Sequence, residues 1–135
     1  MGIHDDYGKS LLRRAGGSRY DTSGTNSFSF GLDAGEARLD GVIAEDIVVE
    51  IESRTDKQIR GALLDLILHP YPKKLMLLIP MHMNSVERTR RQCEAVLARF
   101  DVLHRIVVLQ GTGSEPMLEC DTELVRVAIE ELDRV

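Results

Sequence analysis

Hydrophobic and polar positions follow a period of two in the first half of the chain. Three short segments, 27–32, 37–44 and 46–53, show this alternation, which is typical of β-strands. Only a short break near residue 45 separates the second segment from the third, so these two are expected to pair antiparallel as a hairpin. Before them, residues 3–14 fit a short amphipathic helix. Residues 15–26 are rich in Gly, Ser, Thr and Asn and predict a loop.

After residue 54 the period changes to 3.6. Thr55 and Gln58 fit a capping box, in which Thr55 is the N-cap of a helix and Gln58 reaches back to its amide. That helix is expected to end near His69, because Pro70 and Pro72 follow.

Two continuous apolar runs, 74–80 and 105–110, predict strands that are buried on both faces, as in a parallel sheet. A second capping box at 84–87, with Asn84 as N-cap, opens the helix between them. Asp121 or Thr122 is expected to cap a last helix.

The order of these elements predicts one α/β fold. Right-handed crossovers between parallel strands place helices on both faces of a sheet. We therefore expect a three-layer α/β/α sandwich whose mixed central sheet begins with an antiparallel hairpin. Residues 1–135 form a single domain in this interpretation, and the sequence leaves open whether residues 1–26 are a mobile N-terminal segment.

Composition narrows the class of protein. Hydrophobic residues make up 43% of the 135 positions, enough for a core, and no apolar run approaches the roughly 20 residues that span a bilayer. The first residues lack the apolar stretch of a secretory signal. Two cysteines without clustered histidines favour neither a zinc site nor a disulfide scaffold, so a reduced, cytoplasmic chain is expected. The net charge of −5 argues against binding of nucleic acid by bulk charge alone.

Acidic residues gather on the predicted hairpin. Glu50 and Glu52 point to the same face of one strand, because side chains alternate along it. Asp40 comes near Glu50 across the hairpin, and Glu36 stands close behind. Such oxygen ligands suit Mg²⁺ or Mn²⁺. A solvated edge strand is the alternative, but the apolar residues around the acids favour a metal site.

This pattern resembles the PD-(D/E)xK nuclease superfamily, the restriction-endonuclease-like fold. Leu39-Asp40 matches its first motif, Glu50-Ile51-Glu52 matches its second, and Gln58 lies in the first turn of the helix that follows. The likeness covers roughly residues 27–110, including the order of elements. Two departures stand out: Leu precedes Asp40 where the motif has Pro, and Glu52 takes the place of the motif Lys.

The resemblance implies a role for each of these residues. Asp40 and Glu50 would ligate the metal, and Glu52 would hold or deprotonate the attacking water. Arg54, Lys57 or Arg60 would supply the positive charge that the missing Lys provides. Gln58 would contact water or phosphate, although its capping role explains it equally well.

The implied function is that of a Mg²⁺-dependent (or Mn²⁺-dependent) endonuclease that hydrolyses DNA, acting as a homodimer when it cuts both strands, with no membrane partner. The alternative is a catalytically inactive protein of the same fold that binds a partner or forms oligomers, which Glu52 and the acidic net charge favour.

A doubly wound small-molecule domain would need polar groups at the carboxyl ends of the parallel strands. The loop 111–114 lacks the Lys of a phosphate-binding loop. Arginines of the helix after residue 84 either track phosphates or form a solvated face paired with Glu87 and Glu94.

Overall fold

The computed structural model, which describes residues 2–54 and 57–135, contains one five-stranded mixed sheet. Its strand order is β1-β4-β5-β6-β7. The strands are β1 (Tyr20–Asp21), β4 (Gly41–Ile43), β5 (Ile47–Glu52), β6 (Lys73–Leu78) and β7 (Leu103–Val108). The pairs β1–β4 and β4–β5 are antiparallel, whereas β5–β6 and β6–β7 are parallel. The expected mixed α/β sheet with an antiparallel hairpin is therefore present.

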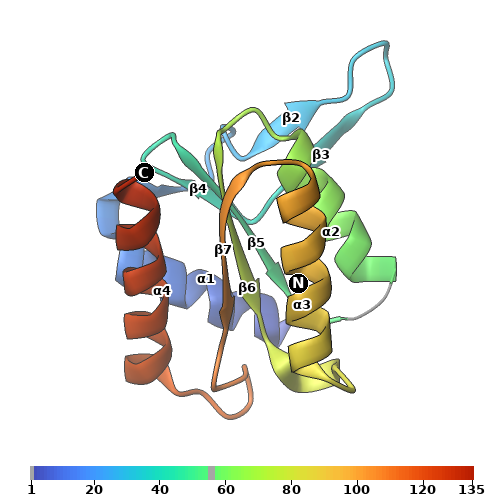
Figure 1. Cartoon of the computed structure of the whole chain (residues 1–135). Coiled ribbons are helices and arrows are strands. Elements are labelled where there is room, and N and C mark those ends of the chain that lie inside the picture. Colours follow the sequence, from blue (N-terminus) through green and yellow to red (C-terminus); the bar gives the residue numbers. More distant parts are fainter. Residues whose placement is uncertain (1, 55–56) are drawn as a thin grey trace.

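Helices cover both faces of this sheet (Figure 1). One face carries α1 (Ile3–Gly16) and α4 (Leu118–Asp133), and the other carries α2 (Lys57–Leu68) and α3 (Val86–Arg99). Short 3-10 turns occur at Gly17–Arg19 and Pro80–His82. None of the described helices is long and apolar enough to cross a membrane.

The two apolar clusters follow from the alternation of side chains along the strands. On β5, Ile47, Val49 and Ile51 face α1 and α4, whereas Val48 faces α2 and α3. All six residues of β6 are buried, as the continuous apolar run predicts. Lys74 tolerates this burial because its ammonium group donates hydrogen bonds to the carbonyls of His69, at 2.7 Å, and Tyr71, which follow the end of α2.

The predicted strand 37–44 is wrong in one respect, because it is two strands interrupted at Leu39-Asp40. Its first part is β3 (Glu36–Arg38), which pairs with β2 (Ser27–Ser29) in a separate two-stranded sheet that projects from the fold (Figure 1). The interruption has a physical cause. The side chain of Asn26 donates to the Leu39 carbonyl at 2.8 Å, and the Leu39 side chain is buried beneath α2.

The expected loop 15–26 contains β1, the short outer strand of the main sheet. Tyr20 pairs with Ile43, and its ring packs on the apolar cluster next to α1. α1 itself buries Leu11 and Leu12 completely, so the helix belongs to the packed fold.

Two predicted caps differ from those observed. Ser85 rather than Asn84 is the N-cap of α3, and its hydroxyl accepts from the Arg88 amide at 3.2 Å. α4 begins at Leu118, so Asp121 lies inside its first turn instead of capping it. The predicted cap at Thr55 lies outside the described residues.

Candidate metal centre

Asp40 and Glu50 face each other where β4 meets β5. The register pairs Gly41 with Val49, which places Asp40 directly opposite Glu50. The Asp40 amide donates to the Glu50 carboxylate oxygen Oε1 at 3.1 Å, and the Ile51 amide donates to Oδ2 of Asp40 at 2.7 Å. The convergence of these two acids, expected from the hairpin, is thus confirmed.

Burial dominates the electrostatics of this pair. Burial, together with the neighbouring Asp40, raises the pKa of Glu50 to about 10. Burial also raises the pKa of Asp40, an effect that the hydrogen bond from the Ile51 amide opposes. At neutral pH the pair therefore retains a proton unless a cation neutralises it.

Charged groups from both helical layers act on the pair. Asp5 and Lys9 of α1 affect the pKa of Asp40 in opposite directions, Asp5 raising it and Lys9 lowering it. Asp65 of α2 adds to the rise at Glu50. These three residues were absent from the sequence interpretation. Their distance along the chain gives no local signal, and only the packing of α1 and α2 on the sheet brings them near.

Tyr20 of β1 contacts the backbone next to the Asp40 carboxylate. Its hydroxyl donates to the Asp40 carbonyl at 2.9 Å. Its ring lies directly over Gly41, where an added Cβ would stand 2.3 Å from the ring carbon Cε1. The absence of a side chain at position 41 thus lets the ring approach β4 and fix the backbone beside the acid.

Glu52 has different partners. Its carboxylate is buried and accepts from the amides of Ser53 and Arg54, at 3.0 and 2.9 Å. The Arg54 guanidinium adds two further bonds, at 3.0 and 3.2 Å. Within residues 2–54 and 57–135, no group of three or more His, Cys, Asp or Glu residues is arranged to hold a metal ion. The structure therefore brings together a pair of acids rather than the predicted trio.

The remaining predicted site residues lie on the surface. Glu36 stands opposite Ser29 in the separate two-stranded sheet and is exposed. Lys57 and Gln58 are exposed in the first turn of α2.

A cavity of about 270 Å³ opens beside Glu52. It is lined by residues at the start of α1 and the end of β5, namely Gly2, His4, Asp5, Glu52, Ser53 and Arg54. Asp5 both lines this cavity and acts on the charge of Asp40.

Two other candidate features have structural explanations. Arg90 of α3 pairs with Glu87, in agreement with a solvated helix face, while Glu94 binds His104 instead. In the loop after β7, the amide of Gly111 donates to Asp121 at 2.9 Å, so it is already satisfied by a carboxylate of the protein. This loop is not arranged as a phosphate cradle.

Comparison of the chain with protein-family models, with curated proteins and with solved structures gave no match.

Proposed function

We propose that the protein is a metal-dependent nuclease that binds Mg²⁺ or Mn²⁺ through Asp40 and Glu50 and hydrolyses phosphodiester bonds of DNA. One observation carries this proposal: the half-buried carboxylates of Asp40 and Glu50 lie opposite each other on adjacent strands, an arrangement that favours a bound proton or cation. A protein gains little stability from such a pair, because each acid loses its hydration. A binding role explains why both are present.

The donor set fits magnesium. Mg²⁺ keeps several of its waters and commonly uses one or two carboxylates together with substrate phosphate oxygens. A third protein carboxylate is not required, so the separate position of Glu52 is compatible with binding. When bound, such an ion would polarise the phosphate and lower the pKa of a coordinated water.

The chain's own residues would orient the substrate. Arg54 has a side chain that is 65% exposed, and it lines the cavity beside Glu52. Contact of its guanidinium with a phosphate would free Oε1 of Glu52, while Oε2 keeps its two amide donors, and Oε1 could then accept a proton from the attacking water. Arg54 would in this way take the place of the positive charge that the motif Lys provides in the family that the sequence resembles.

The order of elements also supports the proposal. A helix, an antiparallel hairpin that carries the acids, a crossover helix and a parallel strand follow one another from α1 to β6. This agrees with the restriction-endonuclease-like arrangement that the sequence resembles. Fold alone does not specify activity, so the weight rests on the acidic pair.

The second candidate is a catalytically inactive binding or oligomeric module. The hydrogen bonds of Glu52 favour it, because backbone amides and Arg54 satisfy the carboxylate without any ligand. In this case Asp40 and Glu50 would serve only to join β4 to β5.

Calorimetric titration with Mn²⁺ and a plasmid-nicking assay together separate the two candidates. The nuclease proposal predicts Mn²⁺ binding and nicking by the wild type, both lost in Asp40→Asn and Glu50→Gln. The control is Asp33→Asn, which removes an exposed acid at the tip of the projecting hairpin. No binding and no nicking by the wild type would reject the nuclease. Nicking that persists in both variants would reject this site.

A further inference from the structure

A groove of about 320 Å³ lies between α2 and α3, which pack side by side on one face of the sheet (Figure 1). Its floor is apolar, because Ile59 and Leu63 of α2 and Val96 of α3 line it. Leu64 is 52% exposed and lies one helical turn beyond the groove residue Arg60, so it extends the apolar surface along α2. An apolar surface between two helices is a common docking site for a third helix.

Two arginines line this groove, Arg60 in the first turn of α2 and Arg99 at the end of α3. Both are exposed, and in the described part of the chain neither guanidinium has an ion pair or a hydrogen bond. None of the described residues that line the groove is acidic. A cation in the first turn of a helix also opposes the helix dipole, so Arg60 does not serve the stability of α2. The chain thus leaves two positive charges unneutralised beside an apolar floor.

We propose that the groove between α2 and α3 binds an amphipathic helix of a partner protein, whose apolar side chains enter the groove and whose acidic side chains pair with Arg60 and Arg99. Two charges of one sign select an acidic partner, and guanidinium groups bind carboxylates through paired hydrogen bonds. The apolar floor favours such a helix over a nucleic acid, since phosphates would leave no apolar group to fill it. No groove residue belongs to the acidic pair of the proposed metal centre, so this inference does not depend on nuclease activity.

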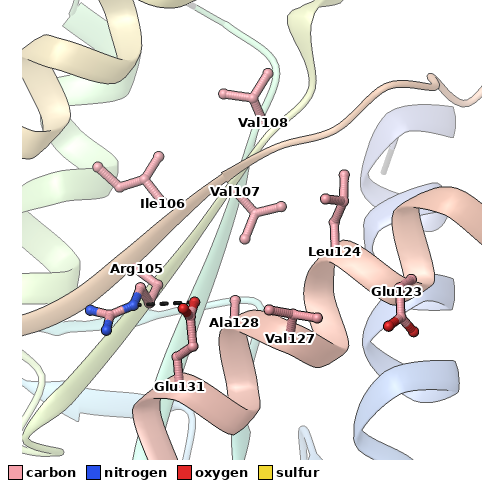
Figure 2. Close-up of a pocket in the computed structure, with 9 residues that line it drawn as sticks. All are labelled: Arg105, Ile106, Val107, Val108, Glu123, Leu124, Val127, Ala128 and Glu131. Carbon is pink, nitrogen blue, oxygen red and sulfur yellow. Dashed lines mark ion pairs between the residues drawn. The ribbon is translucent and has the colours of Figure 1, made fainter.

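The chain's own α4 is a poor match for this groove (Figure 2). It presents exposed apolar side chains such as Leu124, with Glu123 and Glu131 nearby. Glu131 approaches Nε of Arg105 at 3.4 Å, and Glu123 is paired with Arg126, so both acids are neutralised within the chain. A second copy that docked through α4 would have to break these ion pairs to reach the two arginines of the groove. A separate acidic protein is therefore the occupant that the charges favour.

Selection from a displayed library of random peptides, with the full chain as bait, tests the occupant. We expect enrichment of sequences that carry apolar residues at helical spacing together with Asp or Glu. An enriched peptide should bind Ala95→Trp at least about tenfold more weakly than the wild type, because the added ring fills the groove. The matched control is Ala98→Trp, which adds the same ring at an exposed position of α3 that does not line the groove.

Reversal of charge provides an independent arm. Arg60→Glu and Arg99→Glu should each weaken binding of the enriched peptide by about fivefold. Arg91→Glu changes the net charge equally at an exposed position of α3 outside the groove, and it should change the affinity by less than about twofold. A peptide whose acids are replaced by Lys should bind the double variant of Arg60 and Arg99 more tightly than it binds the wild type.

Four outcomes would overturn the proposal. The first is a selection that enriches no peptide, or peptides without acidic residues, and the second is equal affinity for Ala95→Trp and Ala98→Trp. The third is binding of a duplex oligonucleotide that both Arg60→Glu and Arg99→Glu abolish, which would assign the groove to nucleic acid. The fourth is self-association of the wild type that Ala95→Trp abolishes, which would assign it to a second copy. If circular dichroism shows that Ala95→Trp is unfolded, the charge reversals decide.

Discussion

The backbone amide of Asp40 donates a hydrogen bond of 3.1 Å to the side chain of Glu50, the residue opposite it on the neighbouring strand. Each carboxylate thereby reaches across to the other strand, since Asp40 in turn accepts from the amide that follows Glu50. Two acids held this way repel each other when both are ionised. A proton or a cation bound between the two carboxylates would therefore relieve this repulsion.

Replacement of Glu50 by Gln should change how stability depends on pH. Its pKa is about 10 in the folded protein, against an ordinary value of 4.5. Between these values the unfolded chain releases a proton that the folded protein retains, so wild-type stability falls as pH rises. Glu50→Gln removes this loss and should raise the free energy of unfolding by about 1 to 3 kcal/mol at pH 8, but not at pH 4. Urea unfolding without divalent ions measures both values, and an equal difference at the two pH values would contradict the prediction.

Binding of Mn²⁺ should release a proton. The cation competes with the proton that Glu50 retains, so affinity should rise by up to about tenfold for each pH unit between pH 6 and pH 9. Calorimetry in two buffers of different ionisation enthalpy counts the protons released. Glu50→Gln should bind more weakly and lose most of this dependence. Affinity that does not vary with pH in the wild type would show that Glu50 is not a ligand.

Glu52 and Arg54 form an ion pair, but removal of Glu52 should destabilise the protein more than removal of Arg54. Glu52 is buried and also accepts from two backbone amides, so Glu52→Ala should cost about 1 to 3 kcal/mol. Arg54→Ala leaves those amides in place and removes a side chain that is 65% exposed, so its cost should stay below about 1 kcal/mol. Chemical unfolding of both variants provides the comparison. Equal costs would indicate that the guanidinium is the main partner of Glu52.

Removal of the Tyr7 hydroxyl should destabilise the contact between α1 and α4. This hydroxyl donates to the fully buried Asp121 at 2.5 Å, and burial, with a smaller effect from that bond, raises the pKa of Tyr7 to about 12. Tyr7→Phe should cost about 1 to 3 kcal/mol, because Asp121 retains only two amide donors. Tyr71→Phe is the control, since no hydrogen bond of its hydroxyl is found in the described part of the chain. A cost no larger than that of the control would contradict the prediction.

The features that were predictable from the sequence have strong periodic signals. The apolar run 74–80 corresponds to β6, and the run 105–110 overlaps β7 with a shift of two residues. The prediction that both strands are buried on both faces is wrong for β7, because it is the half-exposed edge strand of the sheet. The pairing of Asp40 with Glu50 followed from strand alternation and a short turn. In each case neighbouring residues determine the structure, so local pattern is sufficient.

The features that the sequence did not reveal depend on tertiary contacts. Asp121 is of a residue type that commonly caps helices. Its carboxylate instead binds Tyr7, which is 114 residues away in the sequence, and the loop after β7, which lies outside its own helix. Glu52 shares a strand face with Glu50, but the carboxylate of Glu52 is hydrogen-bonded to the Arg54 guanidinium. β1 is only two residues long and has no periodicity to detect. Partners of this kind are determined by packing rather than by spacing.

The packing of α1 against α4 has a consequence for the order of folding. Tyr7 contacts Asp121 and Arg19 contacts Asp133, each pair separated by 114 residues. During synthesis, α1 therefore leaves the ribosome long before the helix that covers it, whereas β4 and β5 can pair at once. Closure of so long a loop is slow compared with formation of a hairpin. We expect the late docking of α4 to limit the rate of folding, and a chaperone that shields apolar surface would act on α1 in that interval.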